Sequence, residues 1–257
     1  MGGGGEKGYA DVKFTARSSG GHASAPGKNT PLVRLGRFMA DIEDHPPFAR
    51  RFSPTMEEMF RRLAPNMGFG LKTVLTNLWL FRPLLLKVLP GINASAGAMT
   101  QTTLAFTTAR GSDGLNVLPQ EAYVTGNMRL IHHQAGAESI AAVKKVAAQY
   151  GIETEVLYQD DPCPVVSHDS RQFKLIEQIT ARIYPGVQVT PYVMTGGTDA
   201  KFYKDICPNC IRFAPLYIDT QQYGSVHGLN ENIHRGTLPQ GVDFYKMVIE
   251  KMDTIEA

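Results

Sequence analysis

The sequence predicts a chain of mixed α and β structure in two parts: a ferredoxin-like β-α-β-β-α-β sandwich with a helical insertion, then the second half of an α/β sheet domain. Three observations predict this. Runs of alternating apolar and polar residues are separated by helical patterns. A Met-, Phe- and Arg-rich stretch at about residues 43–98 interrupts them, and after residue 157 the pattern changes to helix, strand and glycine turn. We expect domains at 1–157 and 158–257.

Alternation defines the strands of the sandwich. Ala10, Val12, Phe14 and Ala16 share one face of the first strand. A helix begins at Thr30-Pro31 and carries an apolar stripe. The remaining elements are expected as strands over 102–108, 122–130 and 153–158 and a helix over 140–150 that ends at Gly151.

The insertion is the most apolar part of the chain. The run Val74–Leu89 is interrupted by Arg82, Pro83 and Lys87, and it is too short to span a bilayer. We favour a buried helical hairpin. The less favoured alternative gives the insertion a function, as a lid over an apolar substrate or as a contact with a membrane surface.

The C-terminal part is expected to begin with an amphipathic helix through Phe173 and Ile183, ended by Pro185-Gly186. A strand over 187–193, a short helix, a strand over 211–214 and a final helix follow. The helix and strand order is that of an α/β sheet whose first half is not evident in the chain.

Composition argues against several functions. With 257 residues, 43% of them hydrophobic, the chain has room for one large or two modest domains. A net charge of +2 without a dense Lys/Arg run argues against nucleic acid. Neither a GxGxxG nor a GxxxxGK[ST] motif is present, so a nucleotide site is disfavoured. Three cysteines make no disulfide framework, and Cys207-Pro-Asn-Cys210 lacks the second ligand pair of a structural zinc site.

The glycine run at residues 2–5 resembles no targeting segment. No apolar stretch follows it, so it is not a secretory signal. Glu6 stands where N-myristoylation requires Ser or Thr. A glycine run opening directly into a strand indicates a truncated start or a scar left by engineering of the expressed sequence. The compartment is therefore unknown, with the cytoplasm as the default.

Several polar positions are candidates for function. His22 lies in a polar, glycine-containing loop. Arg129 projects from the polar side of its strand onto a sheet face expected to be free of helices, where a guanidinium suits a carboxylate held bidentately. Each also has an ordinary alternative, as a solvated loop histidine and a salt-bridged surface arginine.

Two further candidates lie in the C-terminal part. In the turn Gly196-Gly197-Thr198-Asp199 the glycines let a ligand approach the main chain, and Thr198 and Asp199 suit a helix cap. His227 lies between Val226 and Gly228 in a polar loop. Taken alone, such a turn is an ordinary strand-to-helix connection.

Five motifs occur in one order along the chain. They are Gly-Gly-His22-Ala-Ser-Ala-Pro26, Asn116-Val-Leu-Pro119, Met128-Arg129, Gly196-Gly-Thr198-Asp199 and His227-Gly-Leu-Asn-Glu231. This order resembles the zinc-dependent M-twenty peptidase family of aminoacylases, carboxypeptidases and desuccinylases, and it covers nearly the whole chain. The insertion, with Trp79, Phe81 and Pro83, looks closest to the carboxypeptidase S and N-fatty-acyl-amino-acid hydrolase branch.

The resemblance implies a lid, or dimerisation, domain inserted into a zinc-exopeptidase-like α/β domain with two bridged zinc ions. It implies His227 as a metal ligand. It implies that His22 reaches across a homodimer to the scissile carbonyl oxygen in the neighbouring subunit's site. Asn116 and Arg129 would hold the substrate carboxylate, beside Gly197 and Thr198.

The reaction that the resemblance implies is hydrolysis of an amide next to a free carboxylate, in a peptide or an N-acyl amino acid. In the family a metal-bound water attacks and a glutamate is the general base. The apolar insertion favours long acyl chains or hydrophobic peptides as substrates. The alternative hypothesis is a non-catalytic dimerisation or binding module, or an inactive fragment.

The chain departs from the family pattern in two places. It contains no H-x-D motif, and Lys201-Phe202 stands where the family often has Arg-His. A catalytic zinc needs about three protein ligands, which one histidine does not supply. We therefore expect the C-terminal portion of such an enzyme: the lid and the second half of the catalytic domain.

Overall fold

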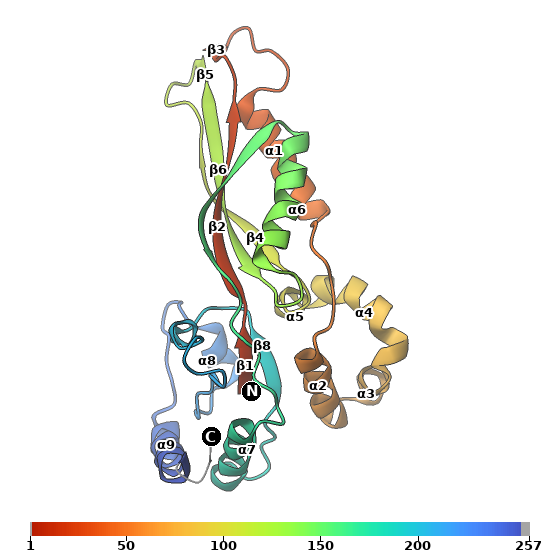
Figure 1. Cartoon of the computed structure of the whole chain (residues 1–257), viewed down its shortest axis with the longest axis vertical. Helices are drawn as coiled ribbons and strands as arrows, with labels where there is room; N and C mark the ends of the chain where they lie inside the picture. Colours follow the sequence, from red (N-terminus) through yellow and green to blue (C-terminus); the bar gives the residue numbers. More distant parts are fainter. Residues whose placement is uncertain (1, 253–257) are drawn as a thin grey trace.

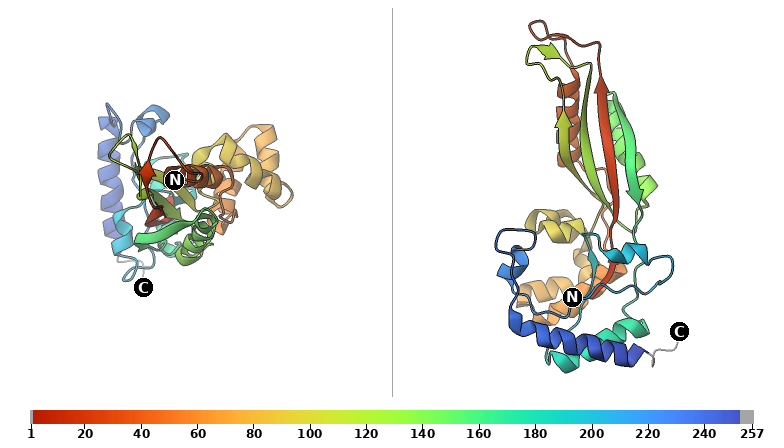
Figure 2. Two further views of the ribbon diagram at one scale, coloured as in Figure 1. Left: turned by 90° about the horizontal axis from the view of Figure 1, so that it is seen from above. Right: turned by 90° about the vertical axis from the view of Figure 1, so that its left-hand side faces the viewer.

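The computed structural model describes residues 2–252, which form an elongated molecule (Figure 1). The upper part is a long sheet with two helices on one face. The lower part surrounds the N-terminal strand, and the helical insertion projects beside it (Figure 1). A second view at right angles shows the same separation of the two parts along the long axis (Figure 2).

The upper part is an antiparallel sheet of four strands in the order β4-β6-β2-β7. Its elements are β2 (Gly8–Arg17), α1 (Pro31–Asp44), β4 (Thr103–Arg110), β6 (Glu121–Leu130), α6 (Gly136–Gln149) and β7 (Ile152–Asp160). This is the predicted β-α-β-β-α-β sandwich, and the expected mixed fold class is confirmed. The short pair β3 (Gly21–His22) and β5 (Val117–Leu118) extends it at the far end.

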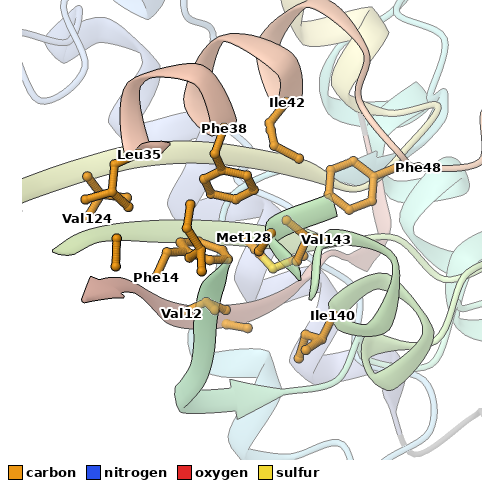
Figure 3. Packing of buried hydrophobic residues seen from close by; sticks show 14 of the residues in the cluster. Val12, Phe14, Leu35, Phe38, Ile42, Phe48, Val124, Met128, Ile140 and Val143 are labelled. Carbon is orange, nitrogen blue, oxygen red and sulfur yellow. The ribbon is translucent and has the colours of Figure 1, made fainter. Parts of the chain in front are cut away.

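The core of the sandwich lies between the sheet and the helices α1 and α6 (Figure 3). Phe14 of β2 and Phe38 of α1 pack with ring centroids 4.8 Å apart. Gly126 of β6 leaves room for this packing: a Cβ there would lie 2.5 Å from Leu104 Cδ1, so the Leu104 side chain would have to move. Along β6 the alternation is as predicted: even-numbered residues are buried, and odd-numbered ones, including Arg129, face the side without helices.

The insertion is helical, as expected. It consists of α2 (Pro54–Leu63), α3 (Phe69–Thr76), α4 (Leu78–Ile92) and α5 (Ala94–Ala98). In α2 the buried Glu58 accepts hydrogen bonds from Arg61 and Arg62, and these charge-assisted bonds hold the pKa of Glu58 down at about 2. Arg62 also donates to the Val189 carbonyl at 2.8 Å, which joins the insertion to the C-terminal part.

The expected buried hairpin is wrong for α4, in which no residue is buried. Only one side of α4 packs on the apolar cluster of α2 and α3, through Leu78, Leu85, Leu86 and Leu89. Within residues 2–252 no helix is long and apolar enough to cross a bilayer.

The lower part contains a short parallel sheet that the sequence did not predict. The glycine run forms β1 (Gly2–Glu6), which pairs in parallel with β8 (Pro191–Met194). The glycines fit a narrow slot: a Cβ on Gly3 would lie 3.0 Å from Arg212 Cβ. We keep the division at residues 157 and 158 as a proposal, with β1 lying beside β8 rather than in the sandwich.

Helices α7 (Arg171–Ile183) and α9 (Leu238–Met252) complete the lower part, with α8 (Thr220–Gly224) between them. Two strand predictions were too long. Residues 187–190 are not a strand, because the chain leaves the Pro185-Gly186 turn with Val187 exposed. The strand expected over 211–214 is reduced to a single bridge between Arg212 and Gly3.

Candidate functional site

A cavity of about 460 Å³ lies where the open face of the sandwich meets the glycine turn of the lower part. Its lining is mostly polar and charged: Glu6, Lys7, Tyr9, Arg129, Asp160, Cys163, Gly197, Thr198, Asp199, Lys201 and Phe202. Residues from β1, β2, β6, β7 and the turn after β8 thus converge here. Three of the predicted site residues, Arg129, Gly197 and Thr198, are brought together.

Arg129 is held in place without an anionic partner. Its Nε donates to Asn127 Oδ1 at 3.0 Å, and its guanidinium lies 4.8 Å from the centroid of the Tyr9 ring. Among residues 2–252 it forms no ion pair with a carboxylate. A Cβ on Gly197 would lie 3.9 Å from Arg129 Nη1, so the turn approaches the guanidinium closely. The arrangement presents an oriented cation with hydrogen-bond donors to a ligand in the cavity.

The glycine turn is fixed by Glu6, a buried residue at the end of β1. Its carboxylate accepts hydrogen bonds from the Thr198 backbone N–H at 3.1 Å, from the Thr198 hydroxyl, and from Arg212 Nε at 3.3 Å. The Cys163 thiol donates to the other oxygen at 3.4 Å. Burial, reinforced by this bond to Glu6, raises the pKa of Cys163 to about 11, so the thiol stays protonated and keeps donating at neutral pH.

Lys7 is buried at the junction between β1 and β2. Its ammonium donates to the carbonyls of Ala98 and Gln101, at 3.0 and 2.8 Å, and to Thr103 Oγ1 at 3.4 Å. Burial, and then the nearby charge of Arg129, lower the pKa of Lys7 to about 7. Lys7 therefore ties the end of the insertion to the floor of the cavity.

The sequence interpretation missed both Glu6 and Lys7. The available signal was a charged pair between Gly5 and Gly8, directly before an alternating strand. Without knowledge of β1, nothing in the pattern indicates that this pair is buried.

His22 and Asn116 meet at the far tip of the sandwich. Both are exposed, and the Ala23 backbone N–H donates to the Asn116 carbonyl at 2.9 Å. His22 Nδ1 lies 2.7 Å from Ser24 Oγ. Strand β6 runs from this tip to Arg129, and its eight steps from Glu121 to Arg129 span about 26 Å at 3.3 Å per residue. Within one chain Asn116 is therefore not beside Arg129, and the right-hand view of Figure 2 shows the tip far from the lower part.

His227 belongs to neither group. It lies on an exposed loop after α8 with a positive φ of 62°, and its backbone N–H donates to Glu231 at 3.1 Å. Among residues 2–252 no three or more His, Cys, Asp or Glu side chains are grouped so that they could hold a metal ion. A single imidazole does not fit a catalytic zinc, so these residues do not by themselves make the metal centre that the resemblance implies.

Comparisons with known proteins agree with the fold. The chain is 29% identical over 252 residues to the N-fatty-acyl-amino acid synthase/hydrolase PM20D1 of Homo sapiens, covering 97% of this chain and 50% of that protein. It is 28% identical over 252 residues to "Probable carboxypeptidase S-like 2" of Dictyostelium discoideum, covering 96% and 47%. The chain thus spans about half the length of the curated relatives it matches.

Solved structures share the architecture at low sequence identity. An M20 family metallo-carboxypeptidase from Sulfolobus solfataricus superposes with a TM-score of 0.60 at 14% identity, covering 97% of this chain and 59% of that one. The di-peptidase Dug1p from Saccharomyces cerevisiae gives 0.65 at 12% identity, covering 100% and 57%. These likenesses concern the fold alone.

The model of a family described as the peptidase dimerisation domain matches residues 4–155, which are more than half of the chain. The match spans β2 to most of β7, including the insertion and Arg129, and it ends before the glycine turn and His227. The chain therefore belongs to the M20 peptidase family, of which it carries the dimerisation domain.

Proposed function

We propose that this chain carries the lid and the carboxylate-binding part of a hydrolase that cleaves an amide next to a free carboxylate, as a carboxypeptidase or an N-acyl-amino-acid amidohydrolase. The proposal rests on the environment of the Arg129 guanidinium. This group is oriented by Asn127 and Tyr9, has no carboxylate partner among residues 2–252, and faces the turn of Gly197. A substrate carboxylate can accept two parallel hydrogen bonds from a guanidinium held in this orientation.

The proposal gives Gly197 and Thr198 a specific role. Gly197 leaves the space beside the guanidinium free of a side chain, and Glu6 holds Thr198 so that the turn keeps its shape. A ligand carboxylate would therefore meet Arg129 from the cavity side. Relatives named as N-fatty-acyl-amino acid hydrolases and carboxypeptidases act on substrates that have such a carboxylate, which supports this class.

A homodimer is part of the same proposal. His22 and Asn116 lie beyond the start of β6, and about 26 Å of that strand separates them from Arg129, so they cannot contact a small substrate bound to Arg129 of their own chain. The match to a dimerisation domain supports a second copy whose tip reaches the cavity. We propose that His22 and Asn116 act together from the neighbouring subunit, His22 on the scissile carbonyl oxygen and Asn116 on the carboxylate.

For the metal, we propose zinc, two ions per complete site, with His227 as one ligand. Because the described residues do not fit the ion alone, the other ligands and the general base would come from sequence corresponding to the unmatched half of the relatives, and we assign the ion no step. Zinc content per purified chain checks this: stoichiometric tight zinc on the 257 residues would contradict it.

The carboxylate role of Arg129 is tested by binding, which the 257-residue chain can show without turnover. N-octanoyl-phenylalanine and its carboxamide are titrated by calorimetry against the wild type and Arg129→Met. We expect the acid to bind more tightly than the amide, and Arg129→Met to lose about tenfold to a hundredfold in affinity for the acid only. Arg182→Met is the matched control, since Arg182 is an exposed arginine of α7 that does not line the cavity.

Two results would refute the assignment: equal binding of acid and amide by the wild type, or an unchanged affinity for the acid in Arg129→Met. The non-catalytic alternative predicts no turnover by any form of the chain. Release of phenylalanine by the 257-residue protein, abolished by a chelator, would exclude that alternative.

A further inference from the structure

Helix α4 exposes an apolar face that nothing in the described structure covers. Its outward side carries Trp79, Leu80, Pro83, Leu84 and Lys87, which we call the α4 outer face. Trp79 is 77% exposed, Leu80 57% and Leu84 56%. The leucines at i and i+4 lie one above the other on this face, while the opposite side of α4 packs on the cluster of α2 and α3.

The face stands on a protrusion. Helices α3 and α4 form an arm that projects away from both the sandwich and the lower part (Figure 1), and the view from above shows the same projection (Figure 2). Phe69, at the start of α3, is 88% exposed on this arm. A projecting arm suits contact with an extended surface better than enclosure of a small molecule. The α4 outer face also does not line the cavity at Arg129.

The charge of the arm has one sign. No Asp or Glu occurs between Glu58 and Asp113, a stretch that includes Lys72 of α3 and Lys87 of α4. Among residues 2–252 neither lysine forms an ion pair, whereas Arg82 is paired with Glu57. Exposed apolar side chains flanked by unpaired lysines are complementary to a surface that has anionic groups on the outside and an apolar layer beneath them.

We propose that the α3–α4 arm docks on an anionic lipid surface. Trp79, Leu80 and Leu84 enter the boundary between headgroups and acyl chains, and Lys72 and Lys87 contact the anionic headgroups. The helix lies along the surface: its 15 residues span about 22 Å, less than the roughly 30 Å of a bilayer core. This inference is independent of the proposed hydrolase function.

A second copy of the chain is the competing occupant. The arm itself has no acidic side chain between Glu58 and Asp113, so two arms facing each other would bring like charges together. A lipid surface with anionic headgroups has no such conflict. We therefore propose an anionic lipid surface, and not a second copy, as the partner of the α4 outer face. The experiment below also detects self-association.

The chain provides its own probe, because Trp79 is its single tryptophan. Its emission is recorded with vesicles of phosphatidylcholine alone and of phosphatidylcholine with phosphatidylserine, and binding is measured by flotation. We expect a blue shift and flotation with the anionic vesicles only, and quenching of Trp79 by brominated acyl chains. Binding should fall in about 1 M salt, where the Debye length is about 3 Å.

Two double variants keep the probe. Leu80→Ser/Leu84→Ser should abolish flotation, and Lys72→Gln/Lys87→Gln should lower the vesicle partition about tenfold or more. The matched controls are Ile249→Ser, an exposed apolar residue of α9, and Lys144→Gln/Lys145→Gln on α6; both should float like the wild type. All substituted residues are exposed, and circular dichroism verifies folding.

The proposal is overturned if the wild-type Trp79 emission and flotation do not respond to anionic vesicles, or if the controls lose binding as much as the α4 variants. It is also overturned if the emission shifts with protein concentration in the absence of lipid and light scattering shows an oligomer that Leu80→Ser/Leu84→Ser dissociates. In that case the occupant of the face is a second copy.

Discussion

The sandwich and the lower part bury very different amounts of apolar side chain. The main cluster of the sandwich joins sixteen buried residues, which come from strands β2, β6 and β7, from helices α1 and α6, and from Phe48 after α1. The cluster between α7 and α9 has three, Leu175, Ile179 and Phe244. Helix α9 leaves Val242, Tyr245 and Ile249 more than half exposed. The sandwich thus carries its own core, and the lower part is held largely by the pairing of β1 with β8 and by Glu6.

The largest expected effect comes from the sandwich core. Phe38→Ala should lower the free energy of unfolding of the sandwich by about 3–5 kcal/mol, because it empties a site closely packed against Phe14 and Phe106. Hydrogen exchange read by mass spectrometry should show loss of protection throughout β2 and β6. Phe244→Ala is the comparison in the lower part, where we expect a smaller cost confined to α7 and α9. Equal loss of protection in both parts with either variant would contradict the comparison.

Glu6→Gln tests the contact that holds the lower part. It leaves the buried Arg212 guanidinium without its carboxylate, which should cost about 3 kcal/mol. Exchange of the Thr198 amide and of α7 should accelerate while β6 stays protected. The double variant Glu6→Gln/Arg212→Met should recover part of the loss in urea unfolding. Loss of protection in β6 equal to that in α7 would show that the two parts unfold together.

Lys7 predicts a pH dependence at the junction of the two parts. Its pKa is about 7 in the folded chain against 10.5 in a free lysine, so between these values the unfolded chain binds more protons. The free energy of unfolding should therefore rise with pH, by about 2 kcal/mol between pH 7 and 9, and should show no contribution from Lys7 below pH 7.

Lys7→Met should remove this rise, while Lys144→Met, at an exposed lysine of α6, should retain it. Denaturant unfolding at a series of pH values checks both. The same rise in Lys7→Met as in the wild type would mean that Lys7 stays protonated in the folded chain.

The elements predicted correctly are those with the strongest local sequence pattern. Strict alternation along β6 assigned Arg129 to the open face and the even-numbered residues to the core, and both assignments are confirmed. The glycine run shows no alternation of apolar and polar residues from which a strand could be predicted. It is buried by Phe173, Arg212 and Val165, which are more than 150 positions away in the sequence. Glu6 and Lys7 were missed for that reason.

The candidate site was only partly accessible to sequence reasoning. The order of motifs along the chain does not show that His22 and Asn116 lie at one end of a long strand pair and Arg129 at the other. That separation is set by the length of β6 and by the β3–β5 ladder at its tip. The burial of α4 was overestimated because most of its residues are apolar, on the exposed side as well as the packed one, while the neighbouring helices α2 and α3 cover only one side.

A single residue, Lys7, separates β1 from β2, so one extended segment runs from the lower sheet into the upper one. The sandwich extends about 30 Å from the cavity. A rigid-body rotation of the sandwich about the cavity would therefore move its tip much more than its base. A rotation of only about 10° would carry the tip with His22 through about 5 Å at this length. The distance between Arg129 and Gly197 would change far less, because both lie close to the axis.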